Sequence, residues 1–319
     1  METRSLNPLL FSSPCLLAFL ALSGLCVYAL VKSDHYRQIA AATLKAADFL
    51  LDATEMMRDA LFSGVAIREK EFSETDLKSN KYENKRGYAF LNALFFERHR
   101  RLLIRPVLIR LGIVAVIFLA VVVGLNLFPG FAEKLDGSSI DNALPGFVLV
   151  MYFASIGDQV CKAMFYNCDI SLLRYSFYRN KEAVLLNFRI RLLRITGLNF
   201  IIAAAISAAV VGLAIIAGVS WPPANMLFFV LSILFLSLFF SVHYLFLYYV
   251  FQPYTAELGM KNPFFGVINT AVYAVCFLCL QIKSAPSYFA LIVLSSTFVY
   301  IAAALIIVYQ YAPQTFRVK

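Results

Sequence analysis

Long uninterrupted apolar runs dominate this chain of 319 residues. A run of about 17 to 25 apolar residues can cross the hydrocarbon core of a bilayer as a helix. Seven such runs occur, at residues 11–31, 107–128, 146–165, 195–219, 225–251, 263–282 and 287–311. Lipid offers the backbone no hydrogen-bond partner, and the runs lack the period-two alternation of barrel strands. The sequence therefore predicts an all-α, polytopic transmembrane bundle of about seven spans, forming one domain over residues 1–319.

The distribution of charge predicts how these spans are oriented. Apolar residues make up 61% of the chain and the net charge is +9, an excess that would indicate nucleic acid binding in a soluble protein. Here most basic residues lie in two loop regions, with fifteen between Lys32 and Arg110 and seven between Lys162 and Arg194. The positive-inside rule places both regions in the cytoplasm, with the N-terminus outside and the C-terminus inside. Nucleic acid is therefore not an expected partner.

The first run is expected to stay as a helix, because Lys32 follows it like a stop-transfer flank, although a cleaved signal peptide is the alternative.

The first loop region, residues 33–106, is expected to be a cytosolic helical insertion. Apolar residues recur every three or four positions over residues 36–67, which predicts a long amphipathic helix. The insertion ends in an aromatic and basic elbow that is expected to lie at headgroup depth against membrane lipids: Phe95, Phe96, Glu97 and Arg98. Aromatic residues at the end of the fifth span are expected in an interfacial belt: Tyr248, Tyr249, Phe251 and Tyr254.

Motifs for catalysis, nucleotide binding and metal binding are missing from the sequence. It contains no G-x-x-x-x-G-K-[ST], H-E-x-x-H or G-x-S-x-G pattern, and no pair of acids suited to an intramembrane enzyme. The chain is therefore not expected to be an enzyme or to hold a cofactor or metal. Any dependence on ATP has to come from a separate protein.

Two ionisable residues inside the predicted spans are candidate functional groups, because charge is costly in hydrocarbon. Asp158 is interpreted either as a substrate or gating contact or, with more weight, as a packing group that forms an interhelical hydrogen bond or pairs with Lys162 four residues later. The neighbouring Gly157 is expected to allow a close helix approach. His243 is expected to be a helix-packing residue rather than a proton relay or metal ligand.

Two segments resemble known transporter elements. Residues 85–101, from Lys85-Arg86-Gly87-Tyr88 to Arg100-Arg101, resemble a segment of ABC exporter permeases of Gram-positive bacteria. Asp169-x-x-Leu172-Leu173 followed by Arg179 is similar to a cytosolic element of ABC-2 type permeases that packs on the ATPase subunit. The resemblance covers about residues 30–220 and the later portion of such a permease. It implies a bacterial plasma membrane protein, an exporter subunit driven by a cytosolic ABC ATPase, and a second copy or a companion permease.

The resemblance makes residues 167–194 a coupling segment that would dock on the ATPase. An apolar face would enter a cleft of the ATPase, Arg174 and Arg179 would pair with its acids, and Asp169 would cap the helix start. The apolar face consists of Leu172, Leu173, Phe177 and Tyr178. In a second interpretation the arginines only anchor the loop to anionic lipid. A rival function of another class is a non-transporting membrane scaffold or immunity protein that binds partners through its cytosolic helices.

Overall fold

The computed structural model describes residues 13–32, 85–128, 130, 136–254, 263–282 and 288–317. These residues are helical apart from turns, short connections and one isolated bridge residue, which confirms the predicted all-α class. The chain divides into two compact units, Met1–Ser63 and Gly64–Lys319. Helix α1 (Ser13–Lys32) belongs to the first unit. The predicted amphipathic helix over residues 36–67, and most of the predicted insertion, lie outside the described residues.

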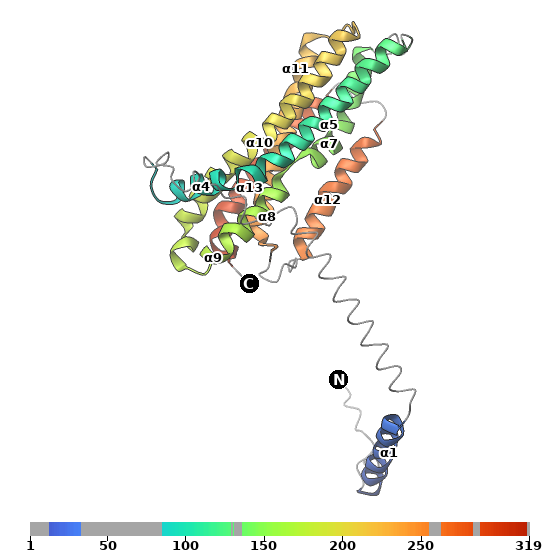
Figure 1. The fold of residues 1–319 in the computed structure, drawn as a ribbon, viewed down its shortest axis with the longest axis vertical. Helices are drawn as coiled ribbons and strands as arrows, with labels where there is room; N and C mark the ends of the chain where they lie inside the picture. Colours follow the sequence, from blue (N-terminus) through green and yellow to red (C-terminus); the bar gives the residue numbers. More distant parts are fainter. Residues whose placement is uncertain are drawn as a thin grey trace. The chain divides into compact units, whose positions relative to one another are not determined.

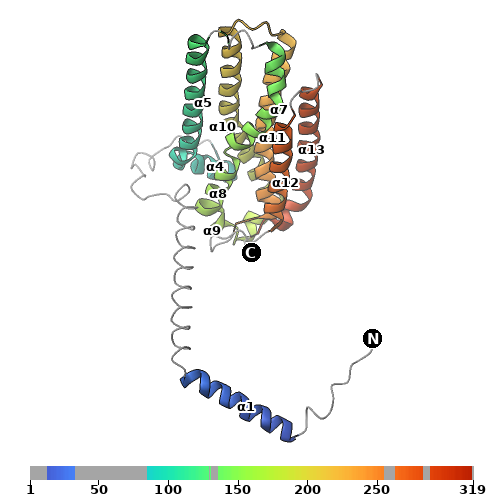
Figure 2. The same ribbon diagram turned by 90° about the vertical axis from the view of Figure 1, so that its right-hand side faces the viewer.

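The second unit is a bundle of long helices, which Figures 1 and 2 show in two views. Its helices are α4 (Gly87–Arg98), α5 (Arg100–Leu127), α7 (Gly137–Ala154), α8 (Gly157–Met164), α9 (Ile170–Leu172), α10 (Lys181–Ile216), α11 (Pro223–Phe251), α12 (Pro263–Leu280) and α13 (Phe289–Thr315). A π-helical turn, Phe165–Asp169, continues α8, and a 3-10 turn, Ser176–Arg179, precedes α10. Helix α11 packs against α13, α10 and α7 and forms the centre of the bundle.

Five helical segments of the described chain are long and apolar enough to cross a membrane: Arg100–Leu127, Gly137–Leu172, Lys181–Ile216, Pro223–Phe251 and Phe289–Thr315. Two further apolar helical segments, Leu17–Ala29 and Phe264–Leu280, are shorter. The side of α5 that faces away from the bundle is apolar, with Val116 and Leu119 largely exposed. Apolar side chains turned outward over a whole helix are expected of a surface that faces lipid. These features indicate a membrane-embedded protein.

Charge is distributed unequally between the two ends of the bundle. All described Lys and Arg residues of this unit lie in the half that contains α4, α8 and the C-terminal ends of α11 and α13, which we call the basic end. At the other end Asp136 caps α7 by accepting the Ser139 backbone N–H at 2.8 Å. Hydrogen bonds from Ser139 and Ser138 lower the pKa of Asp136 to about 2, so it stays ionised.

The predicted third span is not one continuous helix, which corrects the expectation for residues 146–165. Helix α7 ends at Ala154 and α8 begins at Gly157, with Ser155 in an extended conformation between them. The fourth span begins before its apolar run, because α10 starts at Lys181 and extends the predicted run of residues 195–219 toward the basic end.

Candidate functional site

The candidate coupling segment is attached to the bundle through a buried carboxylate, Asp169. The π-helical turn ends at this residue, and the Ile170 N–H bonds to the Phe165 carbonyl in the wider i to i+5 pattern. Asp169 was expected to cap the helix that follows, but α9 has no side-chain cap. The Asp169 side chain is 0% exposed and points instead to Arg191 of α10. The expected capping role is therefore wrong, because the carboxylate is used in the core.

Arg191 uses all five of its N–H donors inside the bundle. Its two terminal nitrogens form a bidentate pair with the two carboxylate oxygens of Asp169, one of them at 2.7 Å. They also donate to the hydroxyl oxygens of Tyr249 at 3.1 Å and Tyr178 at 3.0 Å. The Nε of Arg191 donates to the side-chain oxygen of Asn92 on α4 at 3.0 Å. A guanidinium has five donors and no acceptor, so this residue is fully satisfied without water.

Asp169 is satisfied to the same degree. Its Oδ1 accepts from the Tyr178 hydroxyl at 2.9 Å as well as from Arg191, and its Oδ2 accepts from the Tyr248 hydroxyl as well as from Arg191. Burial raises the pKa of Tyr178, which keeps its hydroxyl protonated and able to donate. Four donors on two oxygens fill the lone-pair positions of a carboxylate. A buried pair of this kind stabilises a fold only if its remaining hydrogen bonds are made, and here they are.

We call this set of six residues the locking cluster: Asn92, Asp169, Tyr178, Arg191, Tyr248 and Tyr249. It joins α4, the π-helical turn, the 3-10 turn, α10 and α11 at the basic end. The aromatic ring of Phe316, just after α13, stacks on Tyr249 with centroids 4.3 Å apart. The residue that follows α13 is therefore in contact with the cluster as well. The segment is held to α10 by a buried ion pair and to α11 by two tyrosine hydroxyls. The locking cluster therefore makes the segment a rigid extension of the bundle.

The structure divides the predicted docking face into an inner and an outer part. Leu173 and Tyr178 are buried, and they are unavailable to a partner in this conformation. Leu172 and Arg179 are half-buried, whereas Arg174 and Phe177 are exposed. Tyr178 points inward because the 3-10 turn directs its hydroxyl to Asp169.

The outer part of the segment is a compact aromatic and basic surface. Phe177 is 54% exposed and stacks on Tyr175, which is 56% exposed, with ring centroids 5.6 Å apart. The Tyr88 hydroxyl donates to the Phe177 carbonyl at 3.0 Å, so this turn is also held from α4. Exposed aromatics beside an arginine are typical of the energetically important centre of a protein interface. Arg174, Tyr175 and Phe177 are hereafter called the outer surface.

The predicted elbow packs into the bundle more deeply than expected. Phe95 and Phe96 of α4 are buried in the core rather than facing headgroups, while Glu97 is half-buried and Arg98 is exposed. Phe96 lies under the guanidinium of Arg194 on α10, 6.0 Å from it. The expectation of aromatics at headgroup depth therefore fails for both phenylalanines, because α10 covers this face of α4. The basic part of the elbow remains at the surface.

Asp158 pairs with Lys162 at 2.7 Å, which confirms the expected pairing. The Tyr254 hydroxyl also donates to Asp158, at 3.1 Å. The expected close approach at Gly157 is confirmed too, since a Cβ there would lie 2.7 Å from the Tyr244 ring. The Asp158 side chain is about one-third exposed at the surface of the bundle.

The helix break between α7 and α8 is stabilised by side chains from two other helices. Asn199 of α10 accepts the Ile156 backbone N–H at 3.0 Å, and its amide donates to Ser155 at 3.2 Å and to Ser241 at 2.8 Å. Arg110 of α5 donates to the Ser155 carbonyl at 3.1 Å. Interrupted helices are tolerated in membranes where other groups satisfy the freed backbone, and in transporters they often border the substrate path.

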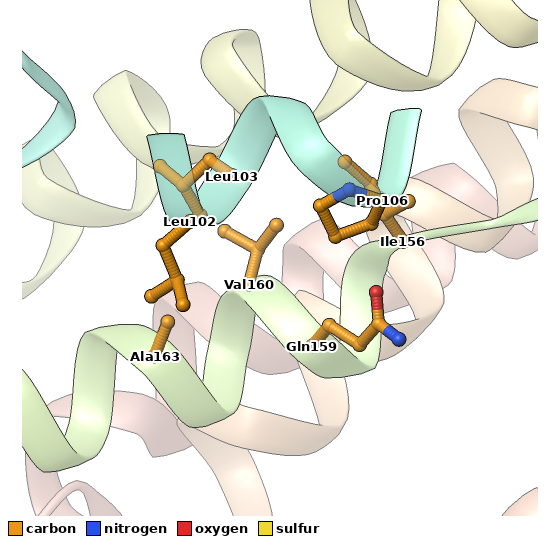
Figure 3. Close-up of a pocket in the computed structure, with 7 residues that line it drawn as sticks. All are labelled: Leu102, Leu103, Pro106, Ile156, Gln159, Val160 and Ala163. Atoms are coloured by element: carbon orange, nitrogen blue, oxygen red, sulfur yellow. The ribbon is translucent and has the colours of Figure 1, made fainter. Parts of the chain in front are cut away.

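A small cavity lies beside this break, between α5 and α8 (Figure 3). Seven residues line it: Leu102, Leu103, Pro106, Ile156, Gln159, Val160 and Ala163. Its volume is about 10 Å³, about the minimum for one water molecule. This cavity is therefore too small for a substrate, whereas a larger one of about 180 Å³ lies between α5, α7 and α10.

His243 lies in the middle of the bundle and contacts α13. Its Nδ1 is 2.7 Å from the Tyr300 hydroxyl, and its ring stacks with Phe239. The opposite side of the ring is buried and interacts with the Asn269 side chain of α12. The Asn269 amide donates to the Tyr152 hydroxyl of α7 at 3.1 Å. His243 therefore contacts both α12 and α13.

The most connected residue of the candidate site, Arg191, was missed by the sequence predictions. A usable signal was present, because Arg191 shares one helix face with Val184, Asn187, Phe188 and Ile195, all of which are buried. Tyr248 and Tyr249 were expected in an interfacial belt, but both are 0% exposed, which corrects that assignment. No protein-family model, curated protein sequence or solved structure matches the chain.

Proposed function

We propose that this chain is the transmembrane permease subunit of an ATP-driven exporter in a bacterial plasma membrane. A separate cytosolic ABC ATPase docks on the outer surface and supplies the energy. In this proposal α1 and α12 are counted with the five long helices, which gives seven spans with the N-terminus outside and the C-terminus in the cytoplasm. The concentration of basic residues at one end supports this orientation, because the cytoplasmic side of membrane proteins is enriched in Lys and Arg.

The observation that carries the proposal is the locking cluster. An ATPase that closes on ATP can move a permease only through an element that does not deform when pushed. Asp169 and Arg191 fix the segment to α10, and Tyr248 and Tyr249 fix it to α11. A displacement applied at Phe177 is therefore passed to two long helices that also hold the helix break through Asn199 and Ser241. This gives a continuous physical path from the outer surface to the interior of the membrane.

The outer surface supplies contacts of the right kind. Arg174 offers a charge to acidic groups of a partner, and the stacked Tyr175 and Phe177 offer apolar area. The buried Leu173 and Tyr178 keep a supporting role beneath this surface. The proposed docking residues are therefore Leu172, Arg174, Tyr175, Phe177 and Arg179, and a second permease copy or a companion permease would complete the pathway.

Photo-cross-linking in the native host tests this proposal directly. A photoreactive phenylalanine analogue is placed at Phe177 and, as a matched control, at Phe128, which is even more exposed but lies at the opposite end. We expect the probe at position 177 to capture a protein whose sequence contains a Walker A motif, and the probe at position 128 not to capture it. Arg174→Glu should reduce this capture, whereas Arg317→Glu, at another exposed position of the basic end, should not.

Two results would contradict the assignment. Capture of the ATPase that is unaffected by Arg174→Glu would separate the outer surface from ATPase binding. Capture at position 177 of a partner without a nucleotide-binding motif would favour the scaffold or immunity function, since the same exposed aromatic pair suits that role.

A further inference from the structure

A second charged surface lies at the basic end, where α4, α5 and α10 meet. Both α4 and α5 pack against α10, and Figure 1 shows α4 lying across this end of the bundle. The three helices carry nine Lys and Arg residues but only two acidic ones, Glu97 and Glu182. Arg101 and Arg105 of α5 and Arg194 of α10 are exposed, and we call these three the basic corner.

The basic corner lies immediately beside the apolar surface of the bundle. Arg101 and Arg105 are one turn apart on α5, and Leu108 follows on the same face with 60% of its surface exposed. On α10, Leu193 is 72% exposed next to Arg194, and the apolar run begins one residue later. Guanidinium groups at the first turn of a lipid-facing surface lie at the depth of phosphate groups in a bilayer.

No described acidic side chain pairs with the basic corner. No ion pair to Arg101, Arg105 or Arg194 occurs within the described part of the chain, where the ion pairs are Asp158–Lys162 and Asp169–Arg191. The Phe96 ring beneath Arg194 holds that guanidinium at the surface without removing its charge. Within the described part of the chain, these three arginines therefore present unpaired positive charge to an anionic group.

We propose that the basic corner binds the headgroup of an anionic phospholipid. Arginine donates paired N–H groups to phosphate oxygens, and the acyl chains of the same lipid can lie along Leu108 and Leu193. An acidic protein partner fits less well. It would have to cover the exposed leucines beside the arginines, or those leucines would have to leave their contact with lipid. This inference does not depend on the proposed ATPase coupling, since the outer surface lies on a different segment.

Lipid retention measured by native mass spectrometry tests the proposal on the full-length chain. The protein is reconstituted in phosphatidylcholine nanodiscs with and without phosphatidylglycerol, and the number of retained phosphatidylglycerol molecules is counted after release. The test variant is Arg105→Gln/Arg194→Gln, and the control is Arg174→Gln/Arg317→Gln, which removes the same charge from exposed positions elsewhere at the basic end. Circular dichroism checks that both variants are folded.

We expect about 25-fold weaker retention of phosphatidylglycerol in the test variant and near wild-type retention in the control. Each of the two arginines removed contributes about a factor of five to binding of an anionic lipid surface. Equal loss in both variants would show a general charge effect and overturn a specific site. Unchanged phosphatidylglycerol retention in the test variant would overturn the lipid site. If the same variant also lost a protein that cross-links to the wild type, the basic corner would be assigned to a protein partner instead.

Discussion

Two aspartates eleven positions apart, Asp158 and Asp169, show how differently the same side chain is used in this bundle. Asp158 pairs with Lys162 on its own helix and keeps about one-third of its surface in contact with solvent. Asp169 pairs with Arg191 of another helix and is fully buried, with four donors on its two oxygens. The first pair is local and replaceable by water, while the second joins separate elements. The comparison indicates that attachment of the candidate coupling segment depends on Asp169 and not on Asp158.

The largest effect is expected from Asp169→Asn. This change leaves the Arg191 guanidinium buried without a counter-charge, and breaking such a pair costs about 3–5 kcal/mol. Replacing both residues, as in Asp169→Leu/Arg191→Met, should be less destabilising than either single change, because no uncompensated charge remains. The free energy of unfolding in detergent, measured for Asp169→Asn and for the four proteins of the Asp169→Leu/Arg191→Met cycle, checks the prediction. A single change that costs no more than about 1 kcal/mol would show that water reaches the pair.

A smaller effect is expected at Gly157, next to Asp158. A methyl group there would lie 2.7 Å from the Cδ2 atom of Tyr244, and overpacking of a tight contact costs about 1–3 kcal/mol. Gly197→Ala on α10 is the matched control, because nothing lies within 4 Å of its added Cβ. The control should leave the unfolding temperature unchanged or raise it, since alanine favours a helix over glycine. Equal destabilisation by both changes would contradict the close contact between α8 and α11.

His99 gives the basic end a pH-sensitive group. Burial lowers the pKa of His99 below its usual 6.5, against a hydrogen bond to the Phe95 carbonyl that raises it. The unfolded chain therefore takes up a proton near pH 6.5 while the folded chain stays neutral. The contribution of neutral His99 to the free energy of unfolding is therefore fully present above about pH 6.5 and is lost as the pH falls below that value. The unfolding temperature measured against pH should show this fall in the wild type and a smaller one in His99→Gln.

The smallest effect is expected from Asp158→Asn. A partly exposed ion pair contributes at most about 1 kcal/mol, and the amide can still accept the hydrogen bond from Tyr254. The free energy of unfolding should therefore change by less than one-third of the change in Asp169→Asn. If the two asparagine variants are equally unstable, the distinction between the two pairs is wrong.

The helical class and the position of the apolar helices were predictable, because hydropathy and helical periodicity are local properties. The ends of helices and the break at Ser155 were not, since the break depends on Asn199 and Arg110 from other helices. The locking cluster is still less local: three partners of Arg191 lie 22, 58 and 99 residues away in sequence. Sequence pattern identified Asp169 but gave it a capping role, because its partner on α10 looked like one more loop arginine.

Hydrogen exchange of the backbone amides of residues 170–180 tests the rigid attachment of the coupling segment most directly. Exchange protection reports the free energy of local opening, and a segment locked by Asp169 and Arg191 opens only together with its anchors. We expect the amides of this segment that donate hydrogen bonds, such as Leu173 and Tyr175, to be protected in the wild type. In Asp169→Asn they should exchange much faster, together with the C-terminal turn of α11, whereas Asp158→Asn should leave them protected. Rapid exchange of these amides in the wild type would contradict the rigid attachment.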